Sequence, residues 1–129
     1  GLMEGNHCFG GGNCDTSAGP NQVNAQGMTA PIAEYNHNVG CSVTGGAVHR
    51  SCEVPGWNGI YFYGDYCSGG VFALTWDGTN VQDLGEVASQ QDRIMGFGHT
   101  GYGDVLFTVV ELNDFNQPVD GKLVRVVPQ

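Results

Sequence analysis

Positively charged side chains are scarce in this sequence of 129 residues. Only Arg50, Arg93, Lys122 and Arg125 stand against 13 carboxylates, which leaves a formal net charge of −9. A surface this acidic repels phosphate groups, so the sequence argues against binding to nucleic acid or to anionic lipid. Hydrophobic runs are also short, and none approaches the roughly 20 residues of a membrane-spanning helix. We therefore expect neither nucleic acid nor a membrane as a partner.

A sustained helical period is absent as well. No segment of ten or more residues repeats apolar side chains every 3.6 positions, so we expect little helix. Short β-type runs occur instead, separated by the turn signals Pro55-Gly56, Asp77-Gly78 and Asp120-Gly121. The seven runs are Val43–Arg50, Gly59–Tyr63, Gly70–Trp76, Asn80–Val87, Arg93–Phe97, Asp104–Val110 and Lys122–Val127. The sequence therefore predicts an all-β fold with its clearest hairpin turn at Asp77-Gly78.

Cysteine use indicates an oxidising compartment. The five cysteines are Cys8, Cys14, Cys41, Cys52 and Cys67, and no two of them form a CxxC motif. In so short a chain they indicate disulfides rather than a zinc site, and hence a secreted or periplasmic protein. Residues 1–40 are rich in Gly, Asn, Ser and Thr without a regular apolar period, so we predict a long N-terminal loop closed by Cys8–Cys14.

Strand spacing alone leaves two architectures open. Seven short strands about 8–15 residues apart suit either a sandwich or the four-stranded antiparallel blades of a propeller. A weak internal repeat favours the propeller. A polar strand with glycine, an apolar strand and a third strand follow each other in 43–76 and again in 93–127.

Two neighbouring motifs carry a resemblance to a known family. They are EYNHNVGCSVTGGAVHR at 34–50 and GIYFYGDYCSG at 59–69. Both resemble the glucose/sorbosone dehydrogenase family, which includes bacterial sugar dehydrogenases and hedgehog-interacting-protein-like relatives. The opening 3–9 and the closing strands 103–107 and 121–125 resemble the same proteins, so the resemblance covers essentially the whole chain.

The resemblance implies that this chain is the last two blades of a six-bladed β-propeller. We expect 1–40 to be a disulfide-bonded loop or insertion and 41–129 to be a partial propeller, with one blade at 41–88 and an incomplete blade at 89–129. Two isolated blades would expose apolar sheet faces. The expected partners are therefore the remaining blades, from the same parent protein or other chains, with a homo-oligomer as an alternative.

The resemblance also implies a function. Sugar-oxidising members of the family bind pyrroloquinoline quinone (PQQ), and calcium is a further cofactor expected of a complete propeller. In these members the catalytic His base lies on an early blade. This chain would then be a portion of a secreted quinoprotein sugar dehydrogenase, inactive alone because it lacks that base. The alternative is a non-catalytic extracellular binding propeller that presents its loops to a partner or assembles with copies of itself. A small sugar is a further expected ligand. No catalytic residue and no metal ligand is assigned within the chain.

Two residues are candidates for cofactor binding by this resemblance. Tyr35 falls where the enzymes have a tyrosine near the quinone, and Arg93 falls on the first of two cofactor arginines. Met95 stands at the second arginine position and Cys67 at a cofactor lysine, which removes two of three cations that would neutralise the carboxylates of PQQ. Whether the protein is an enzyme stays open at this point.

Structural roles compete with each of these functional roles. Arg93 is expected to form an ion pair with Asp92 or Glu86. Asp65 is expected to cap a turn rather than bind calcium. The resemblance places Cys41 and Cys67 on consecutive strands and so implies a second disulfide, which leaves Cys52 either free and buried or paired with another chain.

Overall fold

The chain divides into two compact units, with the boundary along the chain between Tyr35 and Asn36. The computed structural model describes residues 3–11, 13–17 and 27–128. In the first unit, β1 (Met3–Glu4) pairs antiparallel with β2 (His7–Cys8), and the short 3-10 turn η1 (Phe9–Gly11) follows. The loop prediction missed this small hairpin. The disulfide between Cys8 and Cys14 is confirmed.

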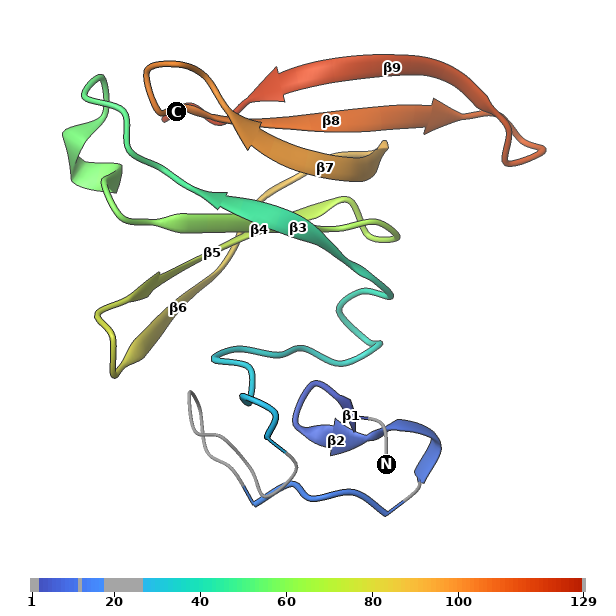
Figure 1. Cartoon of the computed structure of the whole chain (residues 1–129). Coiled ribbons are helices and arrows are strands. Elements are labelled where there is room, and N and C mark those ends of the chain that lie inside the picture. Colours follow the sequence, from blue (N-terminus) through green and yellow to red (C-terminus); the bar gives the residue numbers. More distant parts are fainter. Residues whose placement is uncertain (1–2, 12, 18–26, 129) are drawn as a thin grey trace. The chain divides into compact units, whose positions relative to one another are not determined.

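The second unit contains two antiparallel sheets (Figure 1). The first sheet has the order β3 (Val43–Val48), β4 (Tyr61–Asp65), β5 (Gly70–Trp76) and β6 (Val81–Ser89). The second has the order β7 (Arg93–His99), β8 (Val105–Leu112) and β9 (Pro118–Arg125). A 3-10 turn, η2 (Pro55–Trp57), lies between β3 and β4. The predicted all-β fold and its seven strands are confirmed, and no helix among the described residues is long and apolar enough to cross a bilayer.

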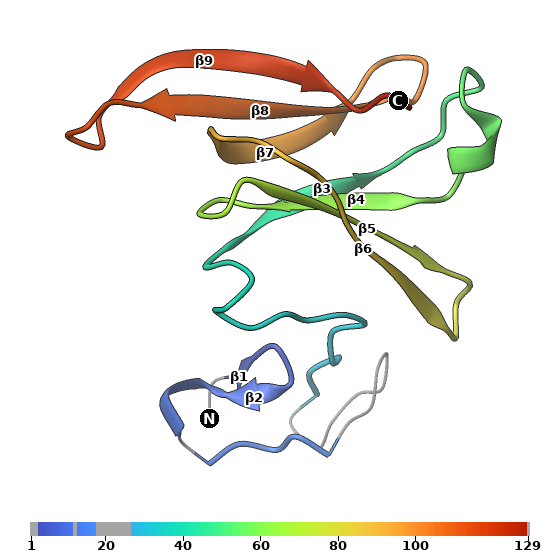
Figure 2. The ribbon, with the colours of Figure 1, turned by 180° about the vertical axis from the view of Figure 1, so that it is seen from behind.

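The two sheets repeat one pattern. Each runs outward strand by strand, and each first strand carries a β-bulge, between Thr44 and Gly46 in β3 and between Ile94 and Gly96 in β7. These two first strands lie next to each other, and the sheets spread apart toward β6 and β9 (Figure 2). A bulge increases local twist and bends its strand. The repeat therefore produces two sheets that fan out from a shared inner edge.

Turn chemistry confirms one predicted reversal and corrects another. The carboxylate of Asp77 accepts the N–H groups of Asn80 and Thr79, which holds the pKa of Asp77 below its ordinary value and closes the β5–β6 hairpin. The predicted turn at Asp120-Gly121 is wrong, because both residues lie inside β9. The turn lies at 113–117 instead, where the side chain of Asn113 accepts two backbone N–H groups. An Asx side chain can close a turn without Asp-Gly, which the sequence reading overlooked.

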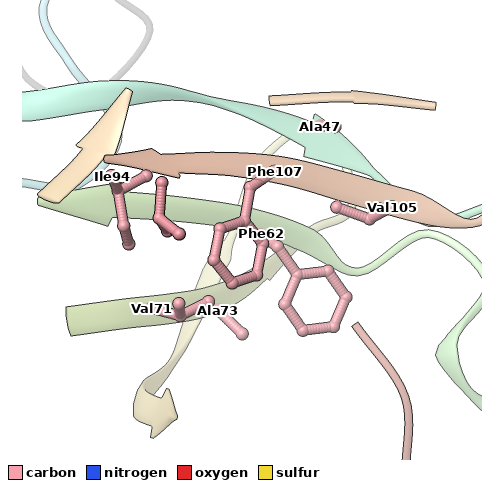
Figure 3. Packing of buried hydrophobic residues seen from close by; sticks show 8 residues of the cluster. Ala47, Phe62, Val71, Ala73, Ile94, Val105 and Phe107 are labelled. Carbon is pink, nitrogen blue, oxygen red and sulfur yellow. The ribbon is translucent and has the colours of Figure 1, made fainter. Parts of the chain in front are cut away.

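The hydrophobic core lies between the two sheets. Its buried members come from both of them: Ala47, Phe62, Val71, Ala73, Ile94, Val105, Phe107 and Val109 (Figure 3). Ile94 is fully buried, and a Cβ atom at Gly64 would meet its Cδ1 at 2.9 Å. Glycine at 64 thus allows β4 to approach β7 closely. The contact between the sheets depends on this close approach.

We predict that Ile94→Ala destabilises the protein by about 2–5 kcal/mol, because truncation leaves a cavity that the two sheets cannot both close. The free energy of unfolding from urea titration measures it. The neighbouring Met95→Ala is the matched control, because Met95 is 53% exposed on the bulge and its truncation removes little packing. Equal losses for the two variants would contradict the placement of the core.

Candidate functional site

A disulfide joins the entrance of β3 to the exit of β4. Cys41 precedes β3 and Cys67 follows β4, and their Cα atoms are 5.6 Å apart. The pairing expected from the family resemblance is confirmed. Cys52 is free of any disulfide and exposed, so the expectation that a free Cys52 would be buried is wrong. The disulfide fixes two loops at the end of the inner strands where the first candidate site lies.

Asp65 organises the loop that carries Cys67. Its fully buried carboxylate accepts N–H groups from Ser42 at 2.7 Å and from Cys67 and Ser68 at 2.8 Å. Gly69 completes this turn at φ +68°, where a Cβ would collide with the carbonyl oxygen of Gln90. The predicted role of Asp65 as a turn cap is confirmed. The loop is held rigidly enough to position the residues around it.

Arg93 lies against this loop from the second sheet. Its guanidinium carbon is 5.7 Å from the ring centre of Tyr66, and its Nη1 donates a hydrogen bond to the carbonyl oxygen of Cys67. The expected ion pair is not found among the described residues, and the carboxylate of Asp92 binds Lys122 at 3.1 Å instead. Arg93 therefore stitches the two sheets together. The remaining N–H donors of Arg93 can bind an anion at this end of the two sheets. We call this region, formed by Arg93, Tyr66 and Cys67, the Arg93 edge.

The two positions at which the resemblance expected cofactor cations to be lost, Cys67 and Met95, indeed add no charge here. Cys67 is consumed in the disulfide, and Met95 is a neutral, half-exposed side chain. Tyr35 belongs to the first unit and Arg93 to the second. The assignment of Tyr35 and Arg93 to a ligand stays a prediction.

Cys41, Asp65 and Cys67 are the residues in the described part of the chain that come closest to a metal-binding set, with their ligand atoms within 4.8 Å of one another. The two sulfur atoms are bonded to each other, so neither is a thiolate that could bind a metal. The carboxylate of Asp65 is already occupied by three N–H donors. In the oxidised protein these three residues therefore have a structural role, which is to hold the loop after β4 in place.

A second polar cluster lies at the opposite end of the inner strands. The hydroxyl of Ser51 donates a hydrogen bond to the carboxylate of the buried Asp104, and this bond is the largest cause of the lowered pKa of Asp104. The hydroxyl of Thr100, which donates to the same carboxylate at 3.0 Å, and the guanidinium of Arg125, which lies 3.8 Å from it, lower that pKa further. His49 is buried beside it, edge-on to Trp57 at 5.7 Å, and its Nδ1 has no hydrogen-bond partner among the described residues. Burial closes this cluster to a substrate, so we assign it to joining the sheets.

Sequence reasoning did not anticipate this second cluster. The signal was present in Gly103-Asp104, a turn pair placed just before an apolar strand. Two of the partners of Asp104, Arg125 and Ser51, lie 21 and 53 positions away along the chain, so their convergence follows from the packing of the sheets.

A cavity opens between the sheets where they diverge. Its volume is about 490 Å³, and it is lined mostly by apolar side chains, among them Trp57, Leu84, Val87, Phe107 and Val124. Arg125 contributes to the lining, but its guanidinium is within 4 Å of Glu53 and Asp104. The cavity has the form expected between two blades that separate with distance from their inner strands.

No family model matches the chain. A solved structure does resemble it, the soluble aldose sugar dehydrogenase of Escherichia coli in its apo form, with a TM-score of 0.61 and 20% sequence identity. The match covers 80% of this chain and 27% of that chain. The protein has the fold of part of a β-propeller. At this level of identity the likeness concerns fold, and it accounts for the fan of sheets and for their adjacent first strands.

We predict that Asp65→Asn lowers the free energy of unfolding by about 2–4 kcal/mol, because an amide cannot accept all three buried N–H groups and loses the negative charge. Asp77→Asn is the matched control, since Asp77 makes the same kind of turn at an exposed hairpin. Urea titration compares the two variants. A loss at Asp77 as large as that at Asp65 would contradict the bracing role.

The lowered pKa of Asp104 predicts a stability loss in acid. A carboxyl whose pKa lies below its usual 3.8 in the folded state stabilises the fold above that value, and the contribution disappears as pH falls through the folded pKa. The stability difference between the wild type and Asp104→Asn should thus be constant above about pH 5 and shrink below pH 3.8. Thermal melts between pH 2.5 and 7 measure it. A difference that persists unchanged to pH 2.5 would refute the linkage.

Proposed function

We propose that this chain is the last two blades of a six-bladed, sugar-dehydrogenase-like propeller that works outside the cytoplasm. The observation that carries the proposal is the fan of two antiparallel sheets with adjacent first strands, which matches the aldose sugar dehydrogenase at a TM-score of 0.61. The chain spans about 27% of the length of that protein. Two disulfides support an oxidising compartment.

The remaining blades are the proposed partners of this chain. Apolar side chains are exposed on the second sheet, including Met95, Val119 and Leu123, each more than half exposed. Sheet faces of this kind are covered by neighbouring blades in a closed propeller. The proposal therefore includes further blades, from the same polypeptide or from other chains, packed against these faces.

In the proposed enzyme this portion would supply the Arg93 edge, and the base that takes the proton of the sugar hydroxyl would lie on another blade. Arg93 can bind an anionic group through its free N–H donors while its hydrogen bond to the Cys67 carbonyl holds it in place. The role of this chain is then to orient a ligand rather than to react with it.

The residues around Arg93 do not fit the cofactor that the family resemblance implies. PQQ carries several carboxylates, and in the described part of the chain this edge offers the single guanidinium of Arg93. Among the residues that the structure describes, no carboxylate set suited to calcium lies beside it, because Asp65 is occupied by backbone donors. This misfit favours the second candidate function, an extracellular propeller that binds a sugar or a partner without oxidising it.

The two functions separate in one assay of the polypeptide that contains this chain. Oxidation of at least one aldose by the protein supplied with PQQ, calcium and a dye acceptor, at a rate at least tenfold lower for Arg93→Ala, would establish the first function. Arg50→Ala is the control, since Arg50 lies outside this edge. Saturable sugar binding in calorimetry without turnover would instead establish the binding propeller. Absence of both turnover and sugar binding would refute every function directed at a sugar and leave only a propeller that binds a partner.

A further inference from the structure

The connection between β3 and β4 contains an Asn-Gly pair, Asn58 and Gly59 (Figure 1). No other asparagine of the sequence is followed by glycine. An asparagine can react with its own backbone, because the nitrogen of the next residue can attack the side-chain Cγ and close a five-membered ring. Glycine resists that attack least, since it carries no side chain beside the nitrogen. The sequence therefore predicts that Asn58 is its most reactive asparagine.

A tight turn presents this pair at the surface. Ile60 donates its N–H to the carbonyl oxygen of Trp57 at 2.9 Å. Between them, Asn58 has φ −59° and ψ 122°, and Gly59 has φ +91°. These angles are those of a type II turn, whose third residue needs a positive φ. Asn58 is exposed, and its side-chain amide has no hydrogen-bond partner within the described part of the chain. The carbon that would be attacked is thus unrestrained.

The attacking nitrogen, in contrast, is restrained by a hydrogen bond. Gly59 donates its N–H to the carbonyl oxygen of His49 at 2.9 Å, and His49 donates its own N–H to Ile60 at 2.8 Å. These two bonds close the base of the loop formed by residues 50–58. The buried ring of His49 lies edge-on to Trp57, with ring centres 5.7 Å apart, which supports the closure. The nitrogen can turn toward the preceding side chain only after its bond to His49 opens.

We propose that Asn58 is a site of spontaneous deamidation and that opening of this loop sets its rate. The deprotonated nitrogen of Gly59 bonds to Cγ of Asn58, and the side-chain nitrogen leaves as ammonia, which produces a cyclic imide. Water then adds to one imide carbonyl and breaks its bond to the nitrogen. Cleavage at the side-chain carbonyl gives aspartate, and cleavage at the main-chain carbonyl gives isoaspartate. Both products carry a new carboxylate, and water is the only co-reactant.

The isoaspartate product does not fit the closed loop. It adds a methylene group to the backbone between Trp57 and Ile60, so the turn and the bonds to His49 lose their spacing. Trp57 packs against the hydrophobic core from this loop and lines the cavity between the sheets. Conversion to isoaspartate therefore opens the loop permanently and loosens the packing of Trp57. Aspartate keeps the original backbone and leaves the loop closed.

This modification goes beyond the proposed function and is independent of it. It requires no ligand, cofactor or partner. The hydrogen bonds that control it lie within the connection between two neighbouring strands of one sheet. Failure of either inference leaves the other standing.

Peptide mass spectrometry after incubation in mildly alkaline buffer measures the conversion of Asn58. We expect conversion to be at least about tenfold slower in the folded protein than in urea, because only the opened loop reacts. Asn58→Gln is the matched control and should stay unconverted in both, since its longer side chain would have to close a six-membered ring. Trp57→Ala should speed conversion in the folded protein, whereas Trp76→Ala, which removes a 48% exposed ring from another strand, should not.

A stability measurement separates the two products. The isoaspartate form, isolated by chromatography, should unfold at a lower urea concentration than the unmodified protein. Asn58→Asp introduces the carboxylate on the normal backbone and should unfold as the unmodified protein does. Equal conversion rates in folded and urea-unfolded protein would overturn the inference. So would a folded Trp57→Ala variant that stays unconverted, or an isoaspartate form as stable as Asn58→Asp.

Discussion

The contact between the two sheets is the constraint on which the rest of the described structure depends. Each sheet has an apolar face that must be removed from water, and Phe62, Ile94 and Phe107 bring the two faces together. The approach is close because position 64 carries no side chain. Once the first strands are adjacent, the divergence of the sheets and the cavity between them follow.

Polar groups hold this contact at both ends. Asp65 and the Cys41–Cys67 disulfide brace one end, where Arg93 reaches across from the second sheet. Asp104 braces the other end through Ser51, Thr100 and Arg125. Buried carboxylates are tolerated in a fold only when their hydrogen bonds are satisfied, and both of these receive several donors. A site at the Arg93 end thus rests on a rigid frame.

The shortage of cations constrains the proposed function more strongly than the likeness in fold supports it. Lys122 and Arg125 each lie near two carboxylates, and the guanidinium of Arg93 is partly committed to Cys67 and Tyr66. A polyanionic cofactor needs several uncommitted cations in one place. A likeness in fold to a sugar dehydrogenase is therefore weaker support for the same chemistry than for the same architecture.

The strands, the Asp77-Gly78 hairpin and the Cys8–Cys14 closure could be predicted from the sequence, because each depends on residues close together in the chain. Its resemblance to a family supplied the Cys41–Cys67 pairing and the propeller. The turn at 113–117 was missed because Asn113 acts through a side-chain cap rather than a glycine. The partners of Arg93 and Asp104 became known only from the packing of the two sheets, since those hydrogen bonds and ion pairs join residues separated by up to 53 positions, and periodicity carries no information about which distant residues meet.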